Sequence, residues 1–414
     1  MTVWRRYRLK DICTYIGSGT TPKSSNSKYY DKGTYNWINT GDLNNGVVSS
    51  SKQQISDFAL KDYPTLRFYP KGTIIEAMYG ATIGKAGMLG MDATVNQACC
   101  AMVIDRNKAI PNFVLYYLVY YKPQLIKESF GGTQPNVNQF KVSNIAICIP
   151  PLESQQKIIT YLDTKLSEID HQVSILTSKR DAYLRLKKSI INHAVTRGLN
   201  PNVKMKDSGI EWIGEVPEHW EVKRMKDICA LSPNIKSCSE YEYGSYLPME
   251  GLRLDQIETS DELVSTLQGK YTPFEDNDLL VAKVTPCFEN GNIAIAKGLT
   301  NGVGFGSSEI FVLRANKYNN IRFLFYMSLS SKFQDKACAT MCGVGGLKRI
   351  SPLFMKTYIM AIPPSTEQRA IATYLDDKCA KIDTIVSNLD KQISRYADLK
   401  RSLIDEVITG KRAV

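Results

Sequence analysis

Two long stretches of the chain carry apolar residues at alternating intervals of three and four, a spacing that places them on one stripe of an α-helix. The stripes lie within residues 150–198 and 363–414. The positions that we expect to pair the two helices and to support docking of other subunits are Leu166, Ile169, Val173, Leu176, Tyr183, Ile190, Ile382, Val386, Leu389, Ile393, Tyr396 and Leu403. Lys187 and Lys400 interrupt the stripe at one equivalent position in each helix. A polar residue in such a seam lowers stability but fixes register and orientation.

Each predicted helix follows a pair of prolines, at 150–151 and at 363–364, which stop it from extending backwards. Ser154 and Thr366 are candidate N-caps just inside these pairs. A helix of about 45 residues spans about 65 Å, and only another helix can bury a stripe of that length. Because a whole domain separates the two helices in sequence, we expect them to pair with each other in antiparallel orientation.

The two helices belong to an internal repeat. Residues 150–174 and 363–387 are identical at 13 of 25 positions, and "WRRYRLKDIC" (4–13) matches "WEVKRMKDIC" (220–229) at six of ten. Self-similarity at a fixed offset indicates duplicated structural units. Each copy therefore reads as a Trp-containing opening, a variable block and a long helix.

The variable blocks contain short β-like runs such as "GTIIEAMYG" and "DLLVAKV", broken by Gly, Asn, Ser and Pro. Each block also holds helical stretches at corresponding points. We therefore predict an α/β (α+β) fold with two similar globular domains, residues 1–149 and 220–362, separated by two long antiparallel helices that form a coiled coil, residues 150–198 and 363–414. The polar, Gly- and Pro-marked segment 199–219 is predicted to be a linker.

The composition is that of an ordinary globular protein, with 43% hydrophobic and 22% charged residues. The net charge of +11 changes the picture, because such an excess favours nucleic acid or another anionic surface as partner. No stretch approaches the roughly 18 apolar residues of a membrane span, and the opening "MTVWRRYRLKDIC" lacks the apolar segment of a secretion signal. We expect a cytoplasmic protein with no membrane association.

The ten cysteines form no CxxC pair, and we expect free thiols in a reducing compartment. The three histidines do not combine with each other or with cysteines at zinc-site spacing, so no metal site is predicted. The chain also lacks a GxxxxGK[ST] nucleotide loop, a GxSxG elbow and an Asn-Pro-Pro-aromatic tetrad. We therefore predict a binding protein with no catalytic residues.

Candidate DNA contacts lie in two pairs of loops, 131–141 with 342–350 and 78–85 with 282–292. These loops are rich in Gly, Asn, Gln, Thr, Lys and aromatic residues. Asn and Gln can pair bidentately with adenine, whereas Arg and Lys can contact guanine or phosphates. A plain turn with solvated side chains is the alternative for each loop. The residues that we expect to contact DNA are Lys85, Thr133, Gln134, Asn136, Asn138, Lys141, Lys283, Asn290, Lys348 and Arg349.

A set of motifs, specific only in combination and in this order, runs along the chain: "NWINTGDL", "GATIGK", "VNQA", "GGTQPNV", "IPPLESQQKI", "MKDSGIEWIGEVPEHWEV", "LLVAKVTPCFENGN", "GVGFGSSE", "IPPSTEQRAI" and "SLIDEVITGK". Through these motifs, over essentially its whole length, the chain resembles the specificity subunits of type I restriction–modification systems. Two departures are small: "LESQQ" replaces the commoner Glu-Gln in the first helix, and the first block lacks the "TPCFENG" form of the second, which suggests that the blocks read different sequences.

The resemblance implies that each variable block is a target recognition domain that reads one half of a split, asymmetric site in double-stranded DNA. The paired helices would set the spacing of the half-sites and dock two modification subunits, which carry the adenine methyltransferase chemistry. Restriction subunits would join this complex. No cofactor is then expected on this chain; S-adenosylmethionine, ATP and Mg are expected on the partner subunits.

Two other interpretations remain open. The chain could be a fragment of a fused restriction–methylation enzyme, which methylation by the purified chain alone would favour. It could also be a non-specific DNA-binding scaffold, which sequence-indifferent binding with a steep dependence on salt would favour.

Overall fold

The computed structural model describes residues 4–129, 136–233, 235, 240–343 and 347–414. The chain divides into two compact units. Unit 1 comprises Met1–Leu176 and Lys391–Val414, and unit 2 comprises Thr177–Asp390. Each unit therefore contains one globular block together with part of each long helix, α4 (Leu152–Arg197) and α10 (Ser365–Ile408).

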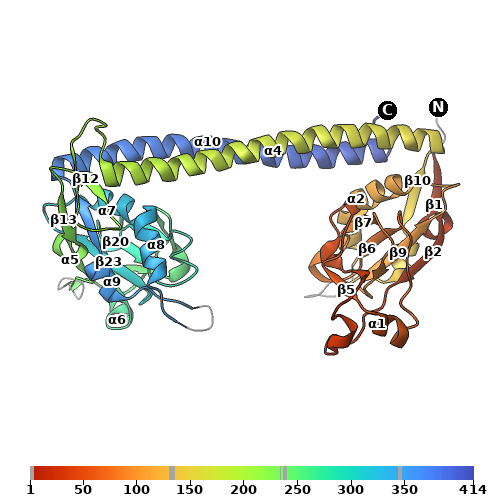
Figure 1. Ribbon diagram of the computed structural model, residues 1–414, viewed down its shortest axis with the longest axis horizontal. Coiled ribbons are helices and arrows are strands. Elements are labelled where there is room, and N and C mark those ends of the chain that lie inside the picture. The colour runs from red at the N-terminus through yellow and green to blue at the C-terminus, as the bar shows by residue number, and fades with distance from the viewer. Residues whose placement is uncertain (1–3, 130–135, 234, 236–239, 344–346) are drawn as a thin grey trace. The chain divides into compact units, whose positions relative to one another are not determined.

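Unit 1 is built on a five-stranded sheet of order β2-β9-β6-β7-β4 and a three-stranded sheet of order β5-β3-β8. Helix α2 packs on β6 and β7 (Figure 1). Its strands are β1 (Arg5–Arg8), β2 (Cys13–Ser18), β3 (Tyr35–Ile38), β4 (Val47–Val48), β5 (Gln53–Ile55), β6 (Ile74–Ala77), β7 (Ala86–Leu89), β8 (Thr94–Val95), β9 (Cys99–Ile104) and β10 (Ala146–Ile149). Its helices besides the long pair are α1 (Asp57–Asp62), α2 (Pro111–Lys127) and α3 (Gln139–Ser143).

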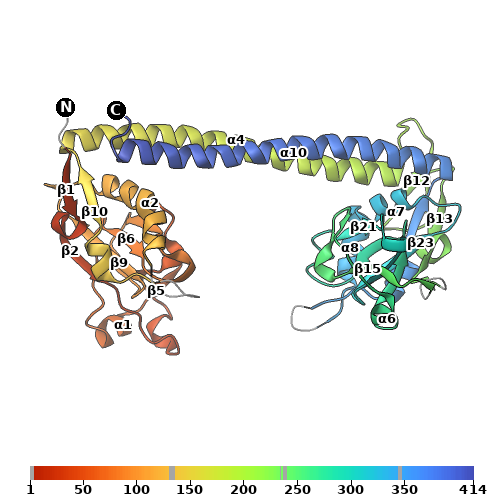
Figure 2. The ribbon, with the colours of Figure 1, turned by 180° about the vertical axis from the view of Figure 1, so that it is seen from behind.

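Unit 2 is built on two four-stranded sheets, of order β14-β23-β20-β21 and β18-β15-β22-β19. Figure 2 shows this unit from behind, where α8, β15 and β21 can be followed. Its strands are β11 (Met205–Asp207), β12 (Glu215–Pro217), β13 (Glu221–Arg224), β14 (Cys229–Leu231), β15 (Tyr243–Leu247), β16 (Leu252–Arg253), β17 (Gln256–Ile257), β18 (Ser260–Leu263), β19 (Thr272–Glu275), β20 (Leu279–Ala282), β21 (Ile293–Ile295), β22 (Val303–Gly306), β23 (Ile310–Ala315) and β24 (Ile359–Ile362). Its helices are α5 (Met225–Ile228), α6 (Val264–Leu267), α7 (Ile321–Ser328), α8 (Ser331–Ala339) and α9 (Pro352–Thr357).

The two units repeat one topology, as the sequence duplication predicts. The order β2-β9-β6-β7 in unit 1 corresponds to β14-β23-β20-β21 in unit 2. The order β5-β3-β8 corresponds to β18-β15-β22, with the same antiparallel and parallel pairings. The opening strand pairs antiparallel with the strand before the long helix in both units, β1 with β10 and β13 with β24. The predicted α+β class with two similar globular domains is confirmed.

Strand β6 shows why these sheets are central to the core. All four of its residues are buried, with Ile74 on the side of α2 and Ile75 on the opposite side. Strand β20 is buried in the same way. A strand that is buried on both faces reads as a continuous apolar run, which is the pattern of "GTII" and "DLLVA".

Glu76 is the polar exception in β6. Its side chain is fully buried, and neither carboxyl oxygen has a hydrogen-bond partner among the residues that the structure describes. Burial raises the pKa of Glu76 to about 8, since desolvation disfavours the charged form. The strand registers place Glu76 opposite Cys100 and Val281 opposite Phe311, so an apolar residue occupies the equivalent position in unit 2.

The long helices pair in antiparallel orientation within each unit, and the two lysines of the seam explain the register. Lys187 Nζ lies 2.6 Å from Asp383 Oδ1 in unit 2, and Lys400 Nζ lies 2.7 Å from Asp170 Oδ1 in unit 1. Each lysine therefore meets a carboxylate of the facing helix. The twelve apolar and aromatic positions assigned to the seam are all buried or partly buried.

The prediction of the two helix N-caps is wrong. Helix α4 begins at Leu152 and α10 at Ser365, so Ser154 and Thr366 lie inside the first turn and not at the N-cap. The reason is that the carbonyl of Pro151 already accepts the first helical hydrogen bond, from Gln155 N. The segment 199–219, which was predicted to be a linker, carries the β11–β12 hairpin and buries Ile213 and Val216 in the core of unit 2.

Candidate nucleic-acid interface

The two loops that were predicted separately in each block meet through the backbone. In unit 1, Tyr79 and Asn136 form an isolated antiparallel bridge, and Val137 N donates to Met78 O at 2.9 Å. In unit 2, Val284 and Arg349 form the same bridge. Ile350 N donates to Lys283 O at 2.8 Å, which is the counterpart of the hydrogen bond from Val137 to Met78. Asn136 and Arg349 therefore occupy equivalent positions.

A third loop joins each pair. Met78 N donates to Ala98 O at 2.9 Å in unit 1, and Lys283 N donates to Glu309 O at 3.0 Å in unit 2. These contacts bring the motifs "VNQA" and "GVGFGSSE" to the same place. We call this arrangement the three-loop site. It comprises residues 78–79, 96–98 and 136–137 in unit 1 and residues 283–284, 307–309 and 349–350 in unit 2.

The side chains at the three-loop site differ between the units. Arg349 makes a two-pronged ion pair with Glu309, with Nε 3.0 Å from Oε2 and Nη2 3.1 Å from Oε1. This pair raises the pKa of Arg349, mainly through the hydrogen bond to Glu309 and also through the negative charge of Glu309. In unit 1 the equivalent positions hold Asn136 and Ala98, which cannot form such a pair. The backbone frame is thus shared, while the hydrogen-bonding groups that it presents are not.

Some of the predicted DNA contacts have structural partners in the chain. The Asn138 side chain caps α3 by accepting a hydrogen bond from Lys141 N at 2.9 Å. Lys141 Nζ lies 3.8 Å from Glu128 Oε2 and donates to the Glu128 carbonyl. The hydrogen bond from Gln124, followed by that from Tyr121 and the charge of Lys141, lowers the pKa of Glu128. The charge of Lys141 is therefore offset within unit 1.

Other predicted contacts are available to a ligand. Asn136, Asn290 and Lys348 are exposed, whereas Lys85 and Lys283 are partly buried, with Lys283 Nζ 5.6 Å from the ring of Phe311. Within the described part of the chain, the side chains of Asn136, Asn290, Lys348 and Lys85 have no hydrogen bond or ion pair. Thr133 and Gln134 lie outside the described residues.

Two aromatic residues at this site were not among the expected DNA contacts, although the loops were chosen partly for their aromatic content. Tyr79 is one of the two bridge residues of unit 1, Phe140 lies four residues after Asn136, and both side chains are exposed. A weak signal was present in the sequence, since both aromatics interrupt otherwise polar loops, "MYGAT" and "NQFK". Aromatic side chains can stack on bases or contact thymine methyl groups.

A buried glutamine in each long helix connects that helix to its globular block through hydrogen bonds. Gln155 of α4 accepts a hydrogen bond from Ile110 N at 2.8 Å, just before α2 begins. Its amide donates to Pro150 O at 2.9 Å and to Lys108 O at 3.2 Å. The neighbouring Gln156 is exposed, and its side chain makes a long hydrogen bond, 3.5 Å, to Thr160.

The same fastening recurs in unit 2. Gln368 of α10 accepts from Asn320 N at 2.7 Å, just before α7 begins. Its amide donates to Pro363 O at 2.9 Å and to Asn319 Oδ1 at 3.0 Å. Gln155 and Gln368 are the identical Gln of the repeated helix, 213 residues apart. A buried side chain with all its hydrogen bonds satisfied fixes one geometry between the block and the helix.

An aspartate eight residues farther along each helix, about two turns, adds a second connection. Tyr116 of α2 donates to Asp163, and Tyr326 of α7 donates to Asp376 at 2.7 Å. In unit 2, Arg322 reinforces this tie through Nε, 2.7 Å from Asp376 Oδ1. The repeated segment "TYLD" thus serves the same structural purpose in both copies.

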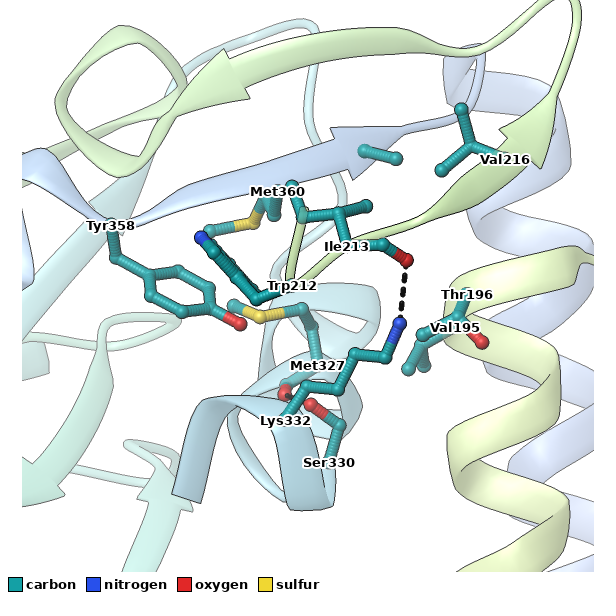
Figure 3. Close-up of a pocket in the computed structure, with 11 residues that line it drawn as sticks. Val195, Thr196, Trp212, Ile213, Val216, Met327, Ser330, Lys332, Tyr358 and Met360 are labelled. Atoms are coloured by element: carbon teal, nitrogen blue, oxygen red, sulfur yellow. Dashed lines mark hydrogen bonds between the residues drawn. The ribbon is translucent and has the colours of Figure 1, made fainter. Parts of the chain in front are cut away.

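A small cavity of about 30 Å³ lies where the hairpin from the predicted linker packs on unit 2 (Figure 3). Trp212 and Tyr358 lie across it with ring centroids 5.1 Å apart, and Lys332 Nζ donates to Ile213 O at 2.6 Å. Desolvation lowers the pKa of Lys332. A space of this size holds about one water molecule. The cavity is therefore a small packing gap between the hairpin and the rest of unit 2, and it is too small to hold a cofactor.

The described residues contain no cluster of three or more His, Cys, Asp or Glu residues that could hold a metal ion. None of the helices in those ranges combines the length and the apolar character needed to cross a membrane.

Comparisons with known proteins agree with this architecture. A family model described as the type I restriction modification DNA specificity domain matches residues 1–176 and 217–395. The MjaVIII specificity subunit of Methanocaldococcus jannaschii is 22% identical over 422 residues, which cover 99% of this chain and 92% of that protein. The EcoEI specificity subunit of Escherichia coli is 29% identical over 199 residues, 47% of this chain and only 33% of that protein.

Among solved structures, the HsdS subunit from Thermoanaerobacter tengcongensis matches with a TM-score of 0.52 and 15% identity, over 99% of this chain and 97% of that one. A chain from a study of type I R-M system assembly and conformational transition matches with a TM-score of 0.72 and 15% identity, over 98% of this chain and 97% of that one. Likeness at this level of identity shows a shared fold.

Proposed function

The chain belongs to the family of type I restriction modification DNA specificity subunits, and we propose that its two globular blocks each contact one half of a divided site in double-stranded DNA. The observation that carries the proposal is the duplicated three-loop site. Its backbone contacts are the same in both units, while Asn136 and Ala98 in one are replaced by Arg349 and Glu309 in the other.

This combination suits a reader of two different half-sites. A shared backbone frame places side chains at the same points relative to the DNA in each block. Amide side chains pair well with adenine, and guanidinium groups pair well with guanine. Different side chains on one frame therefore give different base preferences, and the net charge of +11 supplies the general attraction to phosphates.

The long helices have two roles in this proposal. They set the spacing between the half-sites, because a buried glutamine and a tyrosine–aspartate hydrogen bond hold each block to its helix in a defined geometry. They also dock two modification subunits. Support for docking comes from apolar side chains that the helix pair leaves exposed, namely Ile175, Leu184, Leu186 and Leu399.

The chemistry is assigned to the partners. Adenine methylation with S-adenosylmethionine belongs to the modification subunits, and ATP- and Mg-dependent steps belong to restriction subunits that join through them. This chain then contributes recognition and geometry without a catalytic residue of its own. Methyl transfer by the purified chain alone would contradict this assignment and favour the fused-enzyme alternative.

The test is selection of bound duplexes from a random library by the full chain in complex with its modification subunits. We expect two short conserved elements separated by a gap of constant length. The double variant Arg349→Ala/Glu309→Ala should relax one element and Asn136→Ala should relax the other, because the two sites lie in different units. If the complex bound all sequences of the library equally well, and if its affinity fell steeply as the salt concentration rose, the proposal would be refuted and a non-specific scaffold would be favoured.

A further inference from the structure

The two most exposed large apolar side chains in the described part of the chain lie at equivalent positions. They are Phe140, at 75% exposure, and Leu353, at 68%. Each lies four residues after the bridge residue of its unit, Asn136 or Arg349. Each is also the second residue of the short helix that follows, α3 or α9.

The backbone that carries these side chains is held in place. Val142 in α3 and Met355 in α9 are fully buried two residues farther on. Asn138 and Ser351 cap the two helices, with Ser351 Oγ accepting from Leu353 N at 3.1 Å. The apolar groups are thus presented to solvent by a fixed scaffold.

In unit 1 a further anchor lies directly beside Phe140. The Gln139 side chain accepts hydrogen bonds from Ser18 N at 3.1 Å and from Ser18 Oγ at 3.0 Å, and it donates to Ile16 O at 3.2 Å. These bonds tie α3 to strand β2. They therefore fix the backbone of α3 from which Phe140 projects.

Single exposed apolar residues are common on protein surfaces and need no special explanation. The recurrence argues against that explanation, because Phe140 and Leu353 are both exposed at the same point of two blocks whose loops otherwise differ. Each side chain also follows the three-loop site, among polar and basic neighbours such as Lys348 and Asn136. A protein-binding hot spot would instead be expected inside a contiguous apolar patch.

We propose that Phe140 and Leu353 are specificity-determining residues that make apolar contact with bases in the bound duplex, one in each half-site. Apolar side chains recognise thymine methyl groups in the major groove, and Phe and Leu also act as wedges between base steps. A preorganised apolar group loses little conformational freedom on binding. This inference rests on the proposed function, and it adds a non-polar element to a readout that otherwise depends on amide and guanidinium groups.

The test measures affinity by fluorescence anisotropy, using the full chain with its modification subunits and the duplex obtained by selection with the wild-type complex. We expect Phe140→Ala and Leu353→Ala each to weaken binding of the selected duplex by about 10- to 100-fold. Binding of a scrambled duplex should stay unchanged, since phosphate contacts are intact. Phe140→Leu should restore part of the loss.

Matched controls are Phe58→Ala in unit 1 and Tyr318→Ala in unit 2, because these side chains are 62% and 67% exposed but lie outside the three-loop sites. They should bind the selected duplex like the wild type. Wild-type affinity in Phe140→Ala and Leu353→Ala would overturn the inference. Loss of the modification subunits with unchanged DNA affinity would also overturn it, since the residues would then serve protein docking. A wild-type complex that selects no sequence would overturn the proposed function itself.

Discussion

Replacing Gln155 by Ala should loosen the attachment of the first globular block to helix α4. Gln155 is fully buried and makes three hydrogen bonds, one from Ile110 N and two to the carbonyls of Pro150 and Lys108. Alanine can make none of them. The variant would leave one backbone donor and two backbone acceptors without protein partners at the start of α2 and α4.

The expected cost follows from these three groups. A buried polar group that loses its partner costs about 1–3 kcal/mol. Water can reach part of this region, because Ile110 is only partly buried. We therefore expect a destabilisation of about 2–5 kcal/mol for the local structure, which corresponds to an increase of roughly 30-fold or more in the population of the open state.

The assay is hydrogen–deuterium exchange of the full chain, followed on peptides that cover residues 108–118. The amide of Ile110 should exchange at least roughly 30-fold faster in Gln155→Ala than in the wild type, because its acceptor is gone. Gln156→Ala is the matched control, since Gln156 is adjacent but exposed. That substitution should change stability by no more than about 0.5 kcal/mol.

Gln368→Ala should produce the same effect at the start of α7, because Gln368 makes the corresponding bonds in unit 2. Equal protection of residues 108–118 in Gln155→Ala and Gln156→Ala would refute the reasoning. It would mean that apolar packing alone holds the block to the helix.

Three further predictions concern stability. Glu76 has a folded-state pKa raised to about 8 from its ordinary value of 4.5, so its contribution is fully present below pH 4.5 and is lost as the pH rises through 8. The free energy of unfolding of the wild type, measured by thermal melting, should therefore fall between pH 5 and pH 8 by up to about 1.4 kcal/mol per pH unit. Glu76→Gln should flatten this dependence on pH, and an unchanged slope in that variant would contradict the prediction. Lys187→Asp should lower the melting temperature by facing one carboxylate with another, and the exchanged double variant Lys187→Asp/Asp383→Lys should recover most of the loss; no recovery would mean that the pair does not set the register. Gly410→Ala should cost about 1–2 kcal/mol in denaturant unfolding, because Gly410 has φ +76° and an added Cβ would lie 3.0 Å from the Trp4 ring; wild-type stability would contradict the assigned clash.

Periodic and repeated features could be predicted from the sequence. The heptad spacing of α4 and α10 persists over many turns, so the seam is evident without a structure. The structural role of Lys187 and Lys400 could be predicted only in part. Their position in the seam indicated a register-fixing role, but the partners Asp383 and Asp170 lie some 200 residues away in sequence and outside any local pattern.

The candidate site was less predictable, because it depends on contacts between distant residues. The four loops could be chosen by composition, but their pairing through Tyr79 with Asn136 and Val284 with Arg349 could not. Asn138 is a helix cap because α3 begins at the next residue, and a five-residue helix is too short to show a period. The exposure of Phe140, the second residue of α3, could not be predicted either, because so short a helix shows no buried and exposed face in the sequence.

The central claim is that this chain reads a divided DNA site through two different blocks. The most direct measurement is a genome-wide map of N6-methyladenine in the source strain, with this gene intact and with it deleted. The account predicts that deletion abolishes methylation at one motif made of two short elements separated by a fixed number of unread base pairs. An unchanged map, or loss of methylation at a single continuous motif, would contradict it.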